Sequence, residues 1–245
     1  MSIQRPYRRT SRQLKDGSYA DAGNGRYVRH PKFAQSPTHY IRAFLIIQKD
    51  LIELFDFVEP SDKNSECFSY RTHQLFVRAC IEVEANCKAI LEENGYTSST
   101  WLNMSDYKKI EGSHRASGVR IRLPLWNGAQ GERIPFHAWS SGSELAWYKA
   151  YHGTKHDRHN QFEQANLNNL VDAVCGLAAL LATQFHTEDF ANISLLAAEG
   201  PTDGYDAAIG GYFQVRLPDW PDNERYDFEW ANLKTEADPF EVYPY

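Results

Sequence analysis

The residues best suited to chemistry lie together in residues 147–162, whose sequence is WYKAYHGTKHDRHNQF. This segment holds three histidines, two lysines and an arginine among aromatic side chains, and an apolar run over residues 171–185 follows it. Polar groups held against a protein core need partners, so such a segment favours a functional site. We therefore predict that Lys155, His156 and Arg158 are the candidate catalytic residues, with Tyr151 and His152 in support.

A metal site is the first alternative for these residues. His152 and His156 are four positions apart, the spacing of two ligands on one helix face, and His159 or Asp157 could complete a set. The chain has no HExxH pattern, no CxxC pair and no second ligand cluster. It also lacks the GxSxG, P-loop and GxGxxG motifs of common nucleophile and nucleotide sites. We therefore expect no metal and no cofactor.

The composition is that of a globular protein with reduced cysteines. The chain has 245 residues, of which 42% are hydrophobic and 24% charged, and its net charge is -6. No run of 18 or more apolar residues predicts a membrane span, and no apolar stretch follows the basic N-terminus as in a secretory signal. Cys80 and Cys87, seven residues apart in a helical pattern, are too distant to form a bridge. A cytoplasmic protein without membrane contact is expected.

Helical periodicity predicts long helices at about residues 39–58, 69–93, 141–156 and 164–185. The last of these is apolar nearly all round, which indicates a central position in the core. Two β-like runs flank the glycine-containing turn at residues 127–131, as in a hairpin. The fold class is therefore mainly α: a helical bundle over residues 38–186 with a peripheral β-hairpin insertion at about residues 118–139.

Charge is distributed unevenly between the two ends of the chain. Residues 1–37 carry eight lysines and arginines against two aspartates and lack periodicity, which predicts a basic, loosely ordered arm. Such an arm could contact nucleic acid, or it could be a solvated or self-docking tail. Residues 187–245 are acidic, rich in aromatic side chains and interrupted by prolines, so we expect an extended C-terminal strap packed on the bundle.

The helix at about residues 141–156 should position the candidate site. Ser141 or Ser143 can cap its start. Its alanines and glycine form a small-residue face, which we expect to be buried against another helix. On the helix at residues 69–93, Glu82 and Asn86 lie one turn apart on the flank of the apolar face. We predict that Glu82 or Asn86 meets the basic residues at the seam between these two helices.

Three segments of the chain resemble a group of uncharacterised bacterial proteins. These segments are EANCKAIL (residues 84–91), WYKAYHGTKHDR (residues 147–158) and ERYDFEW (residues 224–230). The signature of the group is similar to W-Y-x-A-Y-N-x-x-K-H-x-R before a long apolar helix. The group in turn resembles HEPN domains, helical bundles of RNases, toxins and phage-defence proteins. The resemblance covers roughly residues 41–185 together with the tail motif, and it implies a helical bundle, an RNA partner and a homodimer.

The chain departs from the HEPN pattern at the catalytic pair. Active HEPN ribonucleases show an Arg-x4-6-His pattern that meets its symmetry mate across a dimer cleft. No histidine follows Arg158 at that spacing, and Arg133 precedes His137 by one residue too few. His152 also stands where the group usually has asparagine. The resemblance therefore predicts the fold of the chain but does not predict the nuclease activity.

Two functions remain open from the sequence. In the first, the protein binds or processes RNA without a metal, in bacterial stress or phage defence. His156 would then act as general acid or base, while Lys155 and Arg158 would bind the phosphate. In the second, the protein is a non-catalytic helical interaction module, and the Lys-His-Arg cluster is a structural polar network paired with acidic groups.

Overall fold

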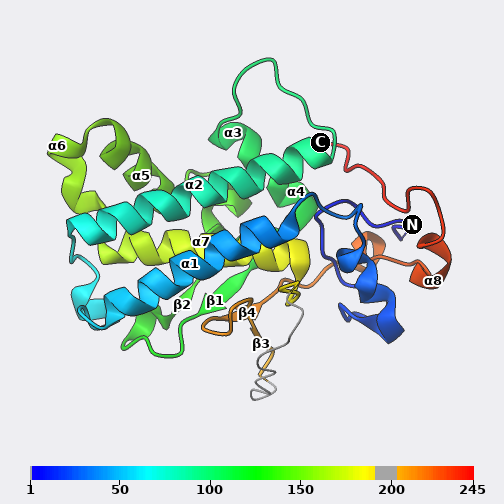
Figure 1. The fold of residues 1–245 in the computed structure, drawn as a ribbon, viewed down its shortest axis with the longest axis horizontal. Helices are drawn as coiled ribbons and strands as arrows, with labels where there is room; N and C mark the ends of the chain where they lie inside the picture. Colours follow the sequence, from blue (N-terminus) through cyan, green and yellow to red (C-terminus); the bar gives the residue numbers. More distant parts are fainter. Residues whose placement is uncertain (1, 191–202) are drawn as a thin grey trace.

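The structure, a computed structural model, describes residues 2–190 and 203–245. In this part of the chain it contains eight α-helices and a small antiparallel sheet, so the fold is mainly α-helical (Figure 1). The long helices are α1 (Pro37–Phe55), α2 (Tyr70–Glu93), α5 (Ala146–His156) and α7 (Leu167–Phe185). The short helices are α3 (Met104–Tyr107), α4 (Ile110–His114), α6 (Arg158–Gln161) and α8 (Trp230–Leu233).

The ends of the long helices follow their local chemistry. The side chain of Ser69 accepts a hydrogen bond from the backbone of Thr72 and caps α2, and Asn166 caps α7 in the same way. The predicted serine cap of α5 is wrong. The N-cap of α5 is Leu145, which has no side-chain cap, while Ser141 and Ser143 bond to each other at 3.0 Å.

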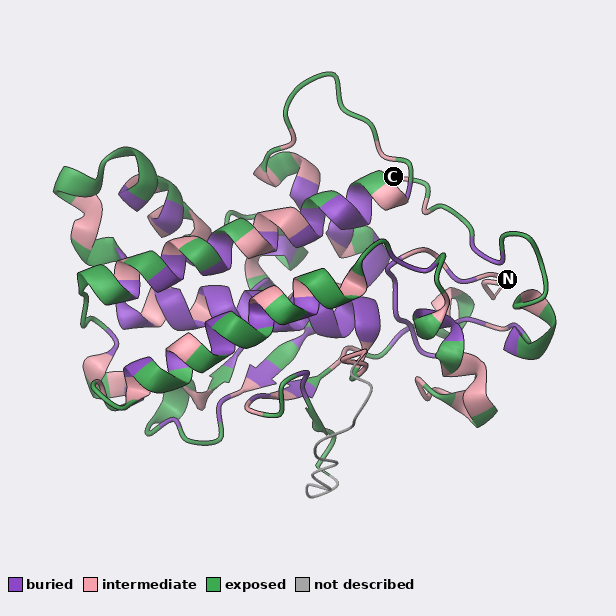
Figure 2. Ribbon diagram, viewed as in Figure 1, coloured by how far each residue is buried: buried purple, intermediate pink, exposed green. Residues whose placement is uncertain are grey.

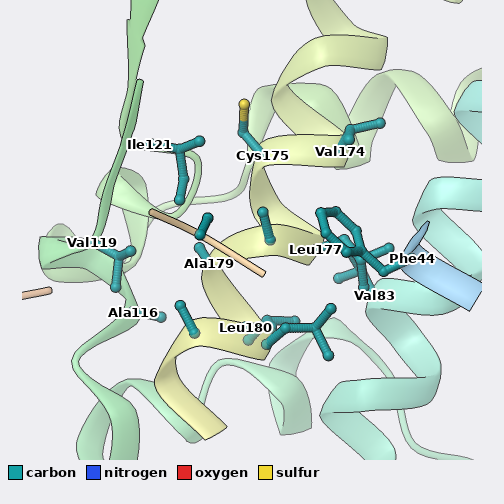
Figure 3. Close-up of a cluster of buried hydrophobic side chains, with 14 of the residues drawn as sticks. Phe44, Val83, Ala116, Val119, Ile121, Val174, Cys175, Leu177, Ala179 and Leu180 are labelled. Atoms are coloured by element: carbon teal, nitrogen blue, oxygen red, sulfur yellow. The ribbon is translucent and has the colours of Figure 1, made fainter. Parts of the chain in front are cut away.

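Helix α7 is the centre of the core, as its composition predicts. It is buried along nearly its whole length and packs against α1, α2 and α5 on one side and strand β1 (Arg120–Arg122) on the other. In Figure 3, Leu177 and Ala179 of α7 lie between Ile121 of the sheet and Phe44 and Val83 of the neighbouring helices. Among the described residues, α7 alone is long and apolar enough by length and composition to cross a membrane, and 89% of that stretch is buried inside the protein.

The predicted hairpin is present, but it belongs to a larger sheet. Strands β1 (Arg120–Arg122) and β2 (Glu132–Arg133) pair antiparallel, with Ile121 opposite Arg133. Strand β4 (Gln214–Arg216) adds to the other edge of β1, and β3 (Asp206–Ala207) pairs with β4. The predicted peripheral position is wrong, because Val119 and Ile121 are fully buried against α7. The sheet therefore covers one side of the central helix.

The N-terminal arm differs from the loosely ordered segment that its composition indicates. Residues 9–14 are all buried, and Arg9 is 0% exposed. The arm lies beside the C-terminal segment, with parallel bridges from Ile3 and Leu14 to Tyr226 and from Tyr7 to Glu241. The aromatic residues of the tail thus pack around the arm, and both chain ends lie at the end of the bundle far from α5 and α6 (Figure 1).

The opposite charges of the two chain ends explain this packing. Arg5 forms an ion pair with Glu236 at 2.7 Å, and Arg8 pairs with Asp238. Lys15 pairs with Asp227 at 3.3 Å. Of the alternatives for the arm, the structure shows self-docking: five of its eight cations form ion pairs within the molecule.

Candidate functional site

Helix α5 presents its aromatic stripe to the core. Trp147, Tyr151 and Thr154 are buried, and the Trp147 indole nitrogen donates a hydrogen bond to the Pro135 carbonyl at 2.8 Å. The small-residue face is not the buried one, because Ala146 is exposed and Ala150 is only half-buried. Burial of large aromatic surfaces removes much more apolar area from water than burial of alanines, so the aromatic stripe decides the orientation.

The predicted basic residues lie on the opposite side of α5, which is exposed to solvent. His152, Lys155 and His156 are exposed, and Figure 2 shows the end of α5 and α6 largely in the exposed colour. The two imidazole rings of His152 and His156 lie 4.4 Å apart between centroids. The Lys155 ammonium donates to the Tyr151 hydroxyl at 3.3 Å. The structure thus brings His152, Lys155 and His156 together above Tyr151.

Arg158 lies just beyond the end of α5. The backbone of Asp157 is not helical, with φ -135° and ψ 54°, so the chain breaks there and Arg158 begins α6. The charge of Arg158 acts on His73 near the start of α2. Burial lowers the pKa of His73, the Arg158 charge lowers it further, and a hydrogen bond with the Thr154 backbone opposes both. Arg158 therefore stands beside the N-terminal end of α2.

The predicted partners Glu82 and Asn86 do not join this cluster. Asn86 is fully buried, donates to the Glu82 carbonyl at 2.8 Å and accepts from the Gln184 side chain at 2.9 Å. Along α2, it lies thirteen residues after His73, or about 20 Å. The Glu82 carboxyl faces His39 and Arg78 instead, whose charges oppose the rise that burial causes in its pKa. The prediction of one shared polar site was therefore wrong.

Glu84 is the acidic neighbour that the sequence reasoning missed. Its carboxylate accepts a hydrogen bond from the Tyr148 hydroxyl at 2.7 Å. Burial and then the Glu84 charge raise the pKa of Tyr151 well above its usual range, and they raise that of Tyr107 to about 12. Two sequence patterns could have identified this contact. Glu84 follows the buried Cys80 by one helical turn, and Tyr148 and Tyr151 lie three positions apart on one side of α5.

The basic cluster has no acidic ion-pair partner in the described part of the chain. Across residues 2–190 and 203–245, neither Lys155, His156 nor Arg158 belongs to an ion pair. In the same part of the chain, no three His, Cys, Asp or Glu side chains gather in a way that could hold a metal ion. The site is thus an exposed group of cations and imidazoles on a helix end fixed by Trp147 and Tyr151.

Comparison of the chain with known protein families, with curated proteins and with solved structures finds no match, so the function is argued from the site.

Proposed function

We propose that this protein binds single-stranded RNA through the exposed end of α5 and the start of α6. One observation carries the proposal: Lys155, His156 and Arg158 are all exposed and have no carboxylate partner in the described parts of the chain, whereas five of the eight cations of the basic arm form ion pairs. Charges that are already neutralised inside a protein cannot displace counterions from a phosphate backbone, but unpaired exposed cations can.

The residue types suit phosphate. The guanidinium of Arg158 can donate two parallel hydrogen bonds to phosphate oxygens, and the ammonium of Lys155 supplies a compact charge. The buried Tyr151 restricts Lys155 through its hydroxyl, so less side-chain freedom is lost on binding. The competing proposal, a structural polar network in a non-catalytic interaction module, needs buried acidic partners, and Glu82 and Asn86 lie elsewhere.

The test is a binding titration with a fluorescent single-stranded RNA. The variant Lys155→Gln/Arg158→Gln should bind more weakly, and the slope of log K against log salt should fall by about one for each phosphate that the protein no longer neutralises. The matched control is Arg42→Gln/Lys49→Gln, because both of these cations are exposed on α1 and neither forms an ion pair with a described residue. Equally weakened binding by both variants, or no binding by the wild-type protein, would refute the proposal.

A second candidate function, metal-independent RNA cleavage, is favoured by the contact between His152 and His156. One neutral imidazole would take the proton of a 2′-hydroxyl as its oxygen attacks the adjacent phosphorus. The other, protonated, would give a proton to the 5′-oxygen as the P–O bond breaks. The products would be a 2′,3′-cyclic phosphate and a 5′-hydroxyl, while Arg158 and Lys155 would stabilise the charge on phosphorus.

Cleavage is tested in EDTA with RNA whose ends are labelled. His156→Ala should abolish cleavage without lowering the melting temperature, and His137→Ala, an exposed histidine outside the cluster, should cleave normally. Cleavage that survives His156→Ala would overturn the catalytic assignment. If the wild-type protein binds RNA without cleaving it, the binding proposal stands alone.

The wider setting belongs to the same proposal. The similarity of the α5 segment to the uncharacterised bacterial group, and through it to HEPN domains, supports an RNA partner. We place the protein in the cytoplasm, as a homodimer acting in bacterial stress or phage defence. Sedimentation of the purified chain with and without RNA tests the homodimer directly.

A further inference from the structure

A pocket of about 550 Å³ lies at the C-terminal half of α2, away from the basic cluster. Its walls come from α2, from residues 95–102 and from α3. Its lining includes the ion pair of Lys88 with Glu92, the aromatic side chains of Tyr96, Trp101 and Tyr107, and the hydroxyl groups of the intervening threonines and serine. A pocket of this size with aromatic walls and a few polar groups suits a small planar ligand.

Trp101 is the unusual residue of this pocket. Its side chain is 91% exposed, whereas the other five tryptophans of the chain are buried. By contrast, Tyr96 is held in place: its hydroxyl donates to Asp106 at 2.6 Å, and Lys109 lies 5.5 Å from its ring centroid. A fixed aromatic ring and an open indole at one pocket are the elements of a stacking site for a base.

Glu84 on α2 lies between the pocket and the candidate site. Tyr107 of the pocket and Tyr148 of α5 both neighbour Glu84, which accepts a hydrogen bond from Tyr148 and whose charge acts on Tyr107. Lys88 of the pocket follows Glu84 by one helical turn. From His73 beside Arg158 to Lys88, the path along α2 is fifteen residues, or about 22 Å. A short stretch of extended nucleic acid can span this distance.

We infer that this pocket receives a nucleobase of the same RNA strand whose phosphates contact Lys155 and Arg158. This inference rests on the proposed RNA-binding function and extends it to the ligand class of a second subsite. The base stacks on Trp101 and Tyr96, while the phosphates of the strand contact Lys155 and Arg158, because Lys88 is already paired with Glu92 at 3.6 Å. Stacking accepts any base, so the pocket adds affinity along the strand with little sequence preference.

Trp101 reports on its own pocket because it is the one exposed tryptophan, so its fluorescence provides the assay. Uridine monophosphate and a single-stranded uridine oligomer of about ten nucleotides are the two probes. We expect both to quench the exposed indole, and Trp101→Ala to remove the quenching. By anisotropy, Trp101→Ala should weaken binding of the oligomer about tenfold or more, the range found when a stacked aromatic is truncated. Trp101→Phe should retain most of the affinity.

The matched control is Phe57→Ala, which removes another highly exposed aromatic side chain, 81% exposed at the far end of α1. If Lys155→Gln/Arg158→Gln weakens oligomer binding but Trp101→Ala binds like wild type, the pocket inference is overturned and the RNA-binding function stands. If no RNA binds, both are overturned. A third outcome is quenching by uridine monophosphate while oligomer binding does not depend on Lys155 and Arg158. This outcome would identify a pocket for free nucleotides and would overturn the inference that one RNA strand occupies both sites.

Discussion

The stability of the protein should fall steeply in mild acid because His114 is buried as a neutral imidazole. His114 is 1% exposed. Its Nε2 lies 2.8 Å from the Arg9 carbonyl and its Nδ1 lies 2.7 Å from the Ser113 hydroxyl. The carbonyl can only accept, so Nε2 carries the proton and Nδ1 accepts from the hydroxyl. Burial, which outweighs the hydrogen bond to Arg9, lowers the pKa of His114 to about 3.

The direction and size of the effect follow from proton linkage. In the unfolded chain a histidine has a pKa of about 6.5, so below that pH the unfolded state binds a proton that the folded state refuses. The contribution of His114 is therefore complete above pH 6.5 and is lost as the pH falls toward 3. The loss is about 1.4 kcal/mol per pH unit once the unfolded histidine is charged, or about 2 kcal/mol at pH 5.

The assay is urea denaturation at pH 7.5 and pH 5, compared between wild type and His114→Gln. Glutamine does not titrate, so this variant should be less stable at pH 7.5 but should lose about 2 kcal/mol less on acidification. His137→Gln, at an exposed histidine, should keep the wild-type difference. The half-buried His30, His73 and His186, whose pKa values burial also lowers, contribute to the wild-type slope, so the comparison between variants is decisive. An equal loss of stability in wild type and His114→Gln would refute the reasoning.

Three further substitutions test the packing and the state of the basic cluster. Glu93→Ala removes the carboxylate that pairs with the fully buried Arg9 at 2.7 Å, and should cost about 3–5 kcal/mol in chemical denaturation because a buried charge loses its partner. Leu181→Ala, in the last third of α7, should cost about 2–5 kcal/mol by leaving a cavity in the core; a cost below 1 kcal/mol would contradict its burial in the core. Arg158→Ala should change the free energy of unfolding by less than about 0.5 kcal/mol, since it is exposed without an ion pair among the described residues. A large loss of stability in Arg158→Ala would instead support the structural-network proposal.

Elements governed by local periodicity were predictable from the sequence. The predicted helix at residues 69–93 is α2, and the predicted central helix is α7, because apolar residues at helical spacing report directly which side is buried. The hairpin was also found, since a glycine-containing turn between two β-like runs is a local signal. In the site, the same local logic placed His152 beside His156.

Features set by distant contacts were not predictable. The charge of the arm around Arg9 predicts a solvated segment. The sequence does not indicate that Glu93, eighty-four residues away, is the partner of Arg9. Asn86 and Glu82 lie on α2 as expected, but which helix each one faces depends on the rotation of α5. That rotation is set by the burial of Trp147 and Tyr151, which outweighs the small-residue face. The contact of Glu84 with Tyr148 was not predicted because it also depends on this rotation of α5.

The pairing of the two chain ends also sets the order in which the molecule can fold. Ser2 bonds to Asp227, and Tyr7 bonds to Tyr226, across more than two hundred intervening residues. Contacts of such separation form late, because the entropy of closing the loop has to be overcome before they contribute. During synthesis, α1, α2 and α7 can therefore associate before the arm has packed. Until then the side chains of Tyr7, Arg9 and Leu14 are exposed to solvent. Residues 226–241 are synthesised after the helices of the bundle, so the arm is covered only once they have joined it.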